Sequence, residues 1–516
     1  MIRYAIAGVL LAIGGVSTAI PDYHMLQQNS YYASRYAKWL SGARSRYLVH
    51  LFFAAILLTC CRWATPFVAA AAVFALVQVL RARSWQKRAI KPLVFTARVC
   101  RLLATNALLI LGFSVVSVLW CRPLRIVAVV LATATPLTVL AVKAINEPIE
   151  AAVRRYYYND ARRILLRHKP MTVIGITGSY GKTSTKYALA ALLQEKYNVC
   201  FTPGSFNTTL GVVRTIRERL KTTDDVFIVE MGAKQVGDIR EICDLVQPDF
   251  GIITSVGEQH LETFKTLENV CRTKFELADA VKRKGGKMYL NMDCPPVAER
   301  AAGYDFVGYG HENGEVCVVE GASGRFGSSF TVTRGETALS LQTKLLGSHN
   351  IQNITGAVAL AMDLGVSERD LRFAVSKLAP VSHRLEMKPF QKGSLLLDDA
   401  YNANPAGCLE AVRVLSTFDG CRKILVTPGL VELGEREEAC NADLGRAAMD
   451  VCDVLVFVGK ERSKPLMAGA ETSERFNREK IFVVSSFQEA MSILSPLLQA
   501  DCVVLLENDL PDNYSK

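Results

Sequence analysis

The chain has no cysteine pair spaced C-x-x-C and no spaced quartet of cysteine and histidine residues, although it contains 14 cysteines. Cys60 and Cys61 lie within an apolar run, and the others are scattered singly. This distribution favours small buried residues in a reducing compartment over a disulfide framework or a zinc site. The sequence also lacks internal repeats and low-complexity tracts.

Acidic residues are scarce in the first third of the chain. Residues 1–168 contain 21 Lys or Arg but only 4 Asp or Glu, whereas residues 169–516 contain 39 and 45. The net charge of +11 therefore conceals a basic, apolar segment joined to a mildly acidic remainder. Because the excess positive charge lies among hydrophobic runs, the high pI does not predict a nucleic-acid partner. A chain of 516 residues exceeds a single core, so two or three domains are expected.

The basic first third contains long apolar runs. A helix needs roughly 20 apolar residues to cross the hydrocarbon of a bilayer, and three of the runs reach or approach that length. The second and third runs are separated by Arg62-Trp63 and form either two short spans or a re-entrant hairpin. Only Met1-Ile-Arg precedes the first run, which is a weak basic region for a signal peptide, and no convincing cleavage site follows. A signal peptide is therefore not favoured. The runs lie near residues 4–20, 47–61, 64–80, 102–120 and 124–143.

These runs predict an all-α transmembrane domain of about five helices over residues 1–145, in contact with the lipid bilayer. The connecting segments 21–46 and 81–101 are basic, so both should stay in the cytoplasm. Five spans with the N-terminus outside satisfy both segments and place the rest of the chain in the cytoplasm of a multi-pass membrane protein. Residues 146–169 predict a basic juxtamembrane linker helix, which lies on the anionic leaflet or is a solvated connector.

From residue 170 the sequence alternates short apolar strands with helical stretches. Strands are expected at 173–177, 226–230, 250–256 and 287–291, with helices between them. This alternation predicts an α/β fold with a doubly wound, mostly parallel sheet. Residues 305–345 are glycine-rich and alternating, which indicates a small antiparallel insertion. A second α/β run begins near 394, so the break at Ala379-Pro380 predicts two domains, 170–380 and 381–516.

The stretch VIGITGSYGKTSTK, residues 173–186, has the order of a triphosphate site. A strand leads into a loop in which Gly178 and Gly181 let the backbone N–H groups point at phosphates. Lys182 brings a positive charge to the β and γ oxygens, and the Thr183 hydroxyl can hold Mg²⁺ at the start of a helix. The strict phosphate-loop pattern would require glycine at Ile176, yet the strand–loop–helix context is complete. The sequence therefore predicts that the chain binds a nucleoside triphosphate.

Polar residues beyond this loop form an ordered series. Glu230 ends the strand 226–230, where a carboxylate would reach a Mg²⁺ ion beside the phosphate loop. His260 follows the next strand, and Lys274 lies one helix later. The series continues with Asn207-Thr208, His349-Asn350, Asn353, Arg384 and the run DDAYNANP at 398–405.

This series resembles the Mur ligase family of ATP-dependent amide-forming enzymes, over roughly residues 170–515. The motifs EMGA…GDI (230–239), TKFEL (273–277), GSHNIQN (347–353) and DDAYNANP (398–405) are most similar to one branch. That branch adds D-alanyl-D-alanine to UDP-MurNAc-tripeptide in peptidoglycan precursor synthesis, through an acyl phosphate. The resemblance implies a P-loop central domain and a Rossmann-like C-terminal domain, with ATP and two Mg²⁺ ions as cofactors.

The resemblance also implies roles for individual residues. Lys182, His260, Lys274 and Arg384 would be catalytic, and Lys274 matches a lysine that is carbamoylated in relatives. Thr183, Glu230 and His260 would bind Mg²⁺. The nucleotide would be held by Gly178, Ser179, Tyr180, Gly181, Lys182, Thr183, Ser184, Asn350, Asn353, Arg384 and Asp399. The substrates would contact Asn207, Thr208, Tyr401, Asn402 and Asn404.

Two departures from the family leave alternatives open. Soluble members begin with a small α/β domain that holds the UDP group, whereas this chain begins with apolar runs. The chain also ends LLENDLPDNY (505–514), where the branch usually has a lysine-glycine-serine stretch. One alternative is a membrane-bound ligase that uses another acceptor, such as a lipid-linked one, or another amine. The other is a non-catalytic membrane scaffold. A transporter is not favoured, because the longer runs carry no central charge.

Overall fold

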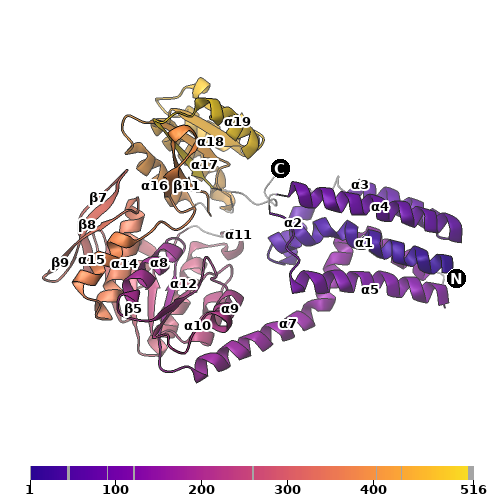
Figure 1. Ribbon diagram of the computed structural model, residues 1–516, viewed down its shortest axis with the longest axis horizontal. Coiled ribbons are helices and arrows are strands. Elements are labelled where there is room, and N and C mark those ends of the chain that lie inside the picture. Colours follow the sequence, from indigo (N-terminus) through magenta and orange to yellow (C-terminus); the bar gives the residue numbers. More distant parts are fainter. Residues whose placement is uncertain are drawn as a thin grey trace. The chain divides into compact units, whose positions relative to one another are not determined.

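The structure, a computed structural model, describes residues 2–42, 47–89, 91–119, 123–257, 261–401, 404–431 and 433–508. The chain forms two compact units (Figure 1). The helical unit lies within residues 1–155 and the α/β unit within residues 156–509. The predicted fold class is confirmed, because an all-helical segment precedes two largely parallel sheets that are covered by helices.

The helical unit consists of apolar helices, and α1 packs along α4 and α5 (Figure 1). The last helix, α7, begins in this unit, and its final turns belong to the α/β unit. The predicted boundary at residue 145 therefore falls inside one continuous helix. The bounds are α1 Ile2–Gln28, α2 Ala33–Gly42, α3 Leu48–Cys60, α4 Ala64–Arg88, α5 Ala97–Leu119, α6 Leu124–Thr133 and α7 Thr135–Arg167.

Among the described residues, three helices are long and apolar enough to cross a membrane: α1, α4 and α5, with 27, 25 and 23 residues. The pair α6 and α7 passes the same test but is bent by 98°, so counting it as one span gives four. Helix α3 has 13 residues, fewer than the roughly 20 that a span needs. The lengths therefore support three or four spans instead of the five predicted from the apolar runs.

Small residues let the helices of this unit approach closely. A Cβ atom on Gly14 would lie 2.5 Å from the ring of Phe74 on α4. A Cβ on Gly15 would lie 2.6 Å from Ile110 on α5 and 2.9 Å from the backbone of Ala132 on α6. Close packing of this kind is a main source of association between apolar helices, because lipid offers no hydrophobic contrast. Helix α1 is thus the centre of the unit.

Asp22 is a buried carboxylate on α1, which continues eight residues beyond the predicted end at 20. The side chain is 2% exposed. Its Oδ1 accepts hydrogen bonds from the hydroxyls of Tyr36 (2.7 Å) and Tyr47 (2.8 Å), and its Oδ2 accepts one from Thr135 (2.6 Å). A buried charge is tolerated only when its oxygens are hydrogen-bonded. Asp22 therefore joins α1 to α2, to the segment before α3 and to the start of α7.

The first sheet of the α/β unit has nine strands in the order β2-β3-β1-β4-β5-β6-β7-β8-β9. Neighbours from β2 to β7 are parallel, whereas β7, β8 and β9 are antiparallel. The expected antiparallel insertion is present, and it extends the same sheet. The strands are β1 Thr172–Thr177, β2 Val199–Phe201, β3 Val226–Glu230, β4 Phe250–Ile253, β5 Lys287–Asn291, β6 Phe306–Gly310, β7 Val316–Gly324, β8 Gly327–Arg334 and β9 Thr337–Thr343.

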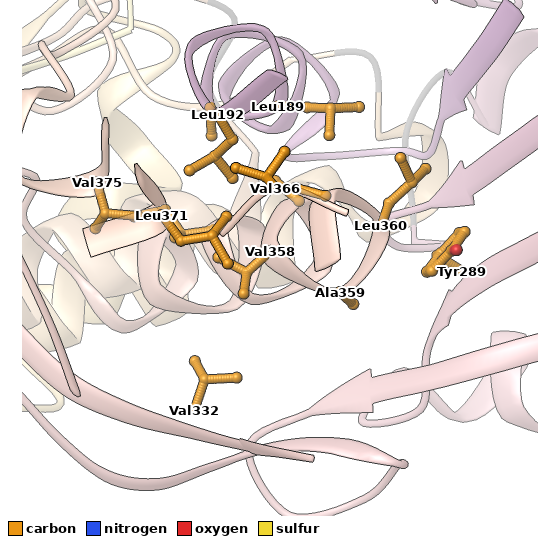
Figure 2. Packing of buried hydrophobic residues seen from close by; sticks show 14 of the residues in the cluster. Leu189, Leu192, Tyr289, Val332, Val358, Ala359, Leu360, Val366, Leu371 and Val375 are labelled. Carbon is orange, nitrogen blue, oxygen red and sulfur yellow. The ribbon is translucent and has the colours of Figure 1, made fainter. Parts of the chain in front are cut away.

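Helices cover both faces of this sheet, so its strands are apolar on both sides. Ile174 and Ile228 contribute to the core beneath α8, α14 and α15, whereas Val173 and Phe227 contribute to the core beneath α9, α10 and α12. Figure 2 shows the first core, where Leu189 of α8 gathers with residues of α14 and α15. The helices are α8 Lys182–Gln194, α9 Thr209–Glu218, α10 Asp238–Val246, α11 Leu261–Phe264, α12 Leu267–Arg283, α13 Pro295–Ala298, α14 Ser348–Asp363 and α15 Glu368–Lys377.

The end of α7 packs against this first lobe. Ala161 is fully buried in the core beneath α9, α10 and α12, together with Ile164 and Leu165 at its border. Asp160 accepts a hydrogen bond from Nε of Arg217 at 2.7 Å. The final turns of α7 are therefore part of the lobe, as expected of a connector helix.

The second sheet has six strands in the order β10-β11-β15-β12-β13-β14, and all neighbours except β10 and β11 are parallel. Its helices α16, α17 and α18 cover one face and α19 the other. The strands are β10 Glu386–Pro389, β11 Leu395–Asp399, β12 Arg422–Thr427, β13 Val454–Val458, β14 Ile481–Val484 and β15 Cys502–Glu507. The helices are α16 Pro405–Ser416, α17 Glu437–Val451, α18 Ser463–Glu471 and α19 Phe487–Leu497.

We expect Leu360→Ala to destabilise the α/β unit by about 2–5 kcal/mol, because it removes a fully buried side chain and leaves a cavity. The measurement is the shift in the denaturant unfolding transition of the full-length protein. The matched control is Leu409→Ala on α16, whose side chain is 39% exposed and which should cost less than about 1 kcal/mol. Equal shifts for the two variants would contradict the packing in Figure 2.

Candidate active site

The phosphate loop joins β1 to α8 at the carboxyl edge of the first sheet. Gly181 has φ +80°, and a Cβ there would lie 2.3 Å from Oδ1 of Asn353, so both conformation and space require glycine. A Cβ on Gly178 would lie even closer to the hydroxyl of Thr254 in the next loop. Helix α8 begins at Lys182, so the N–H groups of its first turn have no partner within the helix. N–H groups of this kind can bind an anion, which is the role that the sequence predicts for this loop.

Lys182 lies against the loop that precedes it. Its Nζ donates hydrogen bonds to the carbonyl oxygens of Gly178 (2.7 Å) and Ser179 (2.9 Å). Burial lowers the pKa of Lys182 to about 8; the charge of Glu230 opposes this shift and that of Arg384 adds to it. The ammonium group therefore lacks an anionic partner strong enough to offset its desolvation, which a phosphate group would supply.

Glu230 is the carboxylate of this site. It ends β3, its Cα pairs with Ile176 of β1, and its side chain is 1% exposed. Its Oε1 accepts hydrogen bonds from the hydroxyl of Thr183 (3.1 Å) and from Nδ2 of Asn207 (3.0 Å). Three predicted site residues from three segments thus meet at one oxygen.

The donor set fits Mg²⁺. In proteins this ion typically takes one or two carboxylates, keeps several waters and binds substrate phosphates. The Thr183 hydroxyl and the Glu230 carboxylate supply two hard oxygen ligands at the mouth of the phosphate loop. Among the described residues no group of three or more His, Cys, Asp and Glu side chains could hold a metal ion by itself. The site therefore suits an ion that arrives with phosphate.

Lys186, which the sequence analysis did not single out, lies at the second oxygen of Glu230. Its Nζ is 2.9 Å from Oε2, and both side chains are buried. Burial alone raises the pKa of Glu230, but the charges of Lys186 and Lys182 outweigh it and hold that pKa below its usual value. The signal for Lys186 was its position four residues after Lys182, on the same face of the helix.

Lys274 is buried on α12. Burial lowers its pKa well below the ordinary value, and the charge of Lys182 lowers it further, whereas Asp238 and Glu276 oppose the shift. Glu276 is itself occupied, because it accepts hydrogen bonds from the backbone N–H groups of Gly237 and Arg240 at the start of α10. Burial and the charge of Lys182 therefore both favour the neutral form of this amine.

The first turns of α14 carry the two asparagines of the predicted nucleotide set. Asn353 accepts a hydrogen bond from Thr185 (3.3 Å) beside the phosphate loop, and Nδ2 of Asn350 donates to Leu346 (2.8 Å). Glu410 of α16, which the sequence analysis missed, accepts hydrogen bonds from the N–H and the hydroxyl of Ser348, both at 2.7 Å. A carboxylate is stabilised at a helix N-terminus, so Glu410 fastens α14 to the second lobe.

Arg384 lies in a segment with unusual backbone geometry. Its neighbours His383 and Leu385 have φ of +59° and +48°, which are costly for residues with a side chain. Oδ1 of Asp399 accepts a hydrogen bond from the N–H of Leu385 (3.0 Å), and Asp398 lies 2.8 Å from Nδ1 of His383. The two aspartates thus hold the segment, and Cζ of Arg384 lies 4.8 Å from the centre of the Tyr401 ring.

The remaining predicted residues have the following places. Thr208 accepts a hydrogen bond from Gly211 as the N-cap of α9, and Asn404 does the same with Gly407 at α16, so both are also structural. The hydroxyl of Tyr401 is 2.6 Å from that of Ser205. Ser179, Tyr180 and Ser184 lie in or just after the phosphate loop. His260 and Asn402 lie outside the described residues.

A cavity of about 580 Å³ opens beside Thr183. One wall is the outer face of α8, including Tyr187, and the opposite wall is the segment 377–384. Tyr401 and Arg384 line it from the second lobe. The arrangement therefore has a phosphate loop, a carboxylate that can share a metal with it, and space for a small organic molecule at the same point.

The sequence matches two known domain families in this order. Residues 176–361 match the Mur ligase middle domain, and residues 383–507 match the Mur ligase, glutamate ligase domain. The two matches cover the two lobes of the α/β unit.

The chain is similar to two UDP-N-acetylmuramoyl-tripeptide–D-alanyl-D-alanine ligases. It is 32% identical to that of Mycobacterium tuberculosis over 364 residues, which are 65% of this chain and 70% of the relative. It is 30% identical to that of Bacillus subtilis over 291 residues, 56% of this chain and 63% of the relative. The chain thus spans less than two thirds of the Bacillus protein.

The fold is similar to that of MurF ligase from Thermotoga maritima, solved in complex with ADP. The TM-score is 0.61 at 26% identity, over 69% of this chain and 80% of the MurF chain. Both domain matches, their order and the extent of the 32% identity agree. The chain therefore belongs to the Mur ligase family.

Proposed function

We propose that the protein is an ATP-dependent amide ligase that adds D-alanyl-D-alanine to UDP-MurNAc-tripeptide in peptidoglycan precursor synthesis. Family membership and the activity named for the two relatives support this proposal. The observation that carries it is the meeting of Thr183, Glu230 and Lys182 at the mouth of a phosphate loop, beside a cavity for a small reactant.

The proposed chemistry activates a carboxylate before an amine attacks it. The acceptor carboxylate takes the γ-phosphoryl group of ATP, which gives an acyl phosphate and ADP. The amine nitrogen then attacks the acyl carbon, the C–O bond to phosphate breaks, and the amide, inorganic phosphate and a proton are released. Both the carboxylate and the γ-phosphate are anionic, so positive charge has to lie between them.

This chain supplies that charge from fixed positions. Lys182 exchanges its hydrogen bonds to the loop carbonyls for phosphate oxygens, and Arg384 approaches from the second lobe. Bound Mg²⁺ would neutralise the phosphates, with Thr183 and Glu230 holding one ion and His260 the other. The lobes also exclude water, which would otherwise hydrolyse the acyl phosphate.

Lys274 is proposed to act as its carbamate. The neutral amine of a lysine adds to carbon dioxide and loses a proton. A side chain that is ordinarily a cation thus becomes an anionic carbamate. Burial and the neighbouring charge of Lys182 favour the neutral amine that this reaction needs. The resulting anion would compensate Lys182 and assist the metal site.

A second candidate keeps the chemistry but changes a substrate. The helical unit stands where soluble relatives hold the UDP group, which favours an acceptor presented at the membrane. Glu507 also stands near the end of β15, where the D-alanyl-D-alanine branch has its lysine-glycine-serine stretch. It pairs with Asp399, is 1% exposed and accepts a hydrogen bond from the thiol of Cys408 (2.9 Å). This departure from the branch favours a different amine.

We also propose a location. The protein is anchored in the cell membrane by the three or four apolar spans, and the α/β unit lies in the cytoplasm, where ATP is available. The basic segments 21–46 and 81–101 support this orientation. A non-catalytic scaffold is less favoured, because Glu230, Lys186 and Lys274 are buried charged residue types that an inactive core would not need.

The central prediction concerns the fate of an oxygen atom. With full-length protein, ATP, UDP-MurNAc-tripeptide carrying ¹⁸O in its carboxylate, and D-alanyl-D-alanine, one labelled oxygen should appear in phosphate per amide formed. Mass spectrometry of the phosphate measures it, and Lys182→Ala is the control that should release none. Amide formation without labelled phosphate would contradict the acyl phosphate. Release of labelled phosphate only when the acceptor is lipid-linked would support the second candidate. ATP binding without phosphate release for any acceptor would support the scaffold.

The affinity for ATP should depend on pH through Lys182. Phosphate oxygens raise its pKa above the ligand-free value of about 8, so the favourable interaction is complete below pH 8 and is lost as pH rises toward the bound pKa. We expect a constant Kd from pH 7.0 to about 7.5 and a rise of up to about tenfold per pH unit above 8. Isothermal titration calorimetry measures it, with Lys182→Met as the pH-independent control. A flat profile for the unmodified protein would contradict this assignment.

Lys274→Ala should abolish ligation, and acetate or propionate should restore part of it, because a small carboxylate can take the place of the carbamate. The readout is amide formation with and without the added acid. Lys282→Ala, an exposed lysine at the end of the same helix that bonds Gly303, should keep full activity and show no response. Absence of restoration in a Lys274→Ala protein that binds ATP normally would rule out the carbamate role.

A further inference from the structure

Two consecutive residues of α8 hold one glycine of the loop 202–208 from both sides. Nζ of Lys186 donates to the carbonyl oxygen of Gly204 at 2.5 Å, and the N–H of Gly204 donates to the hydroxyl of Tyr187 at 3.1 Å. Both backbone polar groups of Gly204 are therefore engaged by side chains of the helix that follows the phosphate loop. We call Lys186 and Tyr187 the Gly204 clamp.

The environment of Lys186 is unusual for a lysine. Its side chain is 0% exposed, and its ammonium group has three partners. They are the carbonyl of Gly204, Oε2 of Glu230 at 2.9 Å, and the ring of Tyr187, whose centre is 4.7 Å away. A buried ion pair commonly contributes less stability than apolar side chains of the same volume. A fully buried lysine at this place therefore indicates that its geometry matters more than its contribution to folding.

The loop that the clamp holds reaches two parts of the candidate site. On one side, Nδ2 of Asn207 donates to Oε1 of Glu230 (3.0 Å), and the carbonyl of Asn207 accepts from Gly232 (2.7 Å). On the other side, the hydroxyl of Ser205 lies 2.6 Å from that of Tyr401 in the second lobe. Gly204 thus lies one residue before Ser205, which contacts Tyr401, and three residues before Asn207, which contacts Glu230.

The second connection leads to Arg384. Cζ of Arg384 lies 4.8 Å from the centre of the Tyr401 ring, a cation–π distance. Ser205, Tyr401 and Arg384 also line the cavity beside Thr183. A displacement of Gly204 would therefore move the partner of Tyr401 and, through it, the arginine that faces the phosphate loop.

We propose that Lys186 is a positioning residue of this site. With Tyr187 it fixes Gly204, and Gly204 in turn sets Asn207 against Glu230 and Ser205 against Tyr401, so that the second lobe presents Arg384. This assignment gives Lys186, Tyr187 and Ser205 a role that the sequence analysis did not give them. Its kinetic consequences rest on the proposed ligase function, whereas its structural consequences do not.

The chain offers a matched control in the same helical segment. Nζ of Lys196, just after α8, bonds two carbonyl oxygens, those of Leu364 (3.1 Å) and Gly365 (2.8 Å), and lies 5.3 Å from the centre of the ring of Tyr197. It therefore repeats the lysine–tyrosine pattern of the clamp at a position away from the cavity. Lys196→Met removes a lysine with two carbonyl partners beside a tyrosine, from an exposed position, without touching the loop 202–208.

The first arm of the test is hydrogen exchange of full-length protein without substrates, in detergent micelles. We expect Lys186→Met to speed amide exchange in peptides covering 202–208 by about tenfold or more, because hydrogen bonds to charged groups are the stronger class. Tyr187→Phe should speed exchange of the Gly204 amide, and Lys196→Met should leave this segment unchanged. Equal exchange in Lys186→Met, Tyr187→Phe and Lys196→Met would overturn the clamp, whether or not the protein is a ligase.

The second arm is steady-state kinetics with the acceptor that supports turnover. Lys186→Met and Ser205→Ala should each lower kcat/KM for the acceptor by about tenfold or more while the Kd for ATP changes less than about threefold. Lys196→Met should match the unmodified protein. A lowered melting temperature with unchanged kcat/KM would show a purely structural role and overturn the proposal. Where Lys186→Met does not fold, Tyr187→Phe and Ser205→Ala, which keep the buried charge, decide both arms.

Discussion

The candidate site depends on the charge balance around the carboxylate of Glu230. An isolated ionised group at 1% exposure is strongly unfavourable, so the chain has to bring compensating groups to it. Lys186 supplies the opposite charge at one oxygen, and Thr183 and Asn207 supply hydrogen bonds at the other. Glu230 ends β3, whereas the compensating groups come from α8 and from the loop after β2. One buried carboxylate thus fixes the relative positions of β3, the start of α8 and the loop 202–208.

The second lobe joins this network through a few polar contacts between side chains. Glu410 accepts hydrogen bonds at the start of α14, and Tyr401 meets Ser205. Asp398 and Asp399 hold the segment of Arg384, whose two neighbours have left-handed backbone conformations. Strain of this kind persists only where surrounding contacts impose it, and it concentrates at functional sites. The backbone on either side of Arg384 is therefore held by the start of the second lobe itself.

The helical unit has a different physical basis. Its helices approach closely because Gly14 and Gly15 leave no side chain between α1 and its neighbours, and Asp22 ties the same helix to three hydroxyl groups. The chain therefore combines the two catalytic lobes of a Mur ligase with apolar helices in place of the first domain of soluble relatives. Glu507 stands beside Asp399 at the carboxyl ends of β15 and β11, and burial raises the pKa of both carboxyl groups. Two neighbouring acids thus lie at this edge of the second sheet.

The class of the fold and the order of the functional segments could be predicted from the sequence alone. The runs 226–230 and 287–291 form β3 and β5 at the predicted bounds, and the phosphate loop lies between β1 and α8. Continuous apolar runs and glycine spacing report local structure, so they could be predicted. The number of membrane spans could not be predicted in this way. The lengths of the apolar runs do not show that α3 ends after 13 residues or that the chain bends by 98° after α6. Only the tertiary structure brought Lys186 to Glu230, Glu410 to Ser348 and Tyr401 to Ser205, because these pairs are far apart in the chain and their partners are set by packing of the sheets.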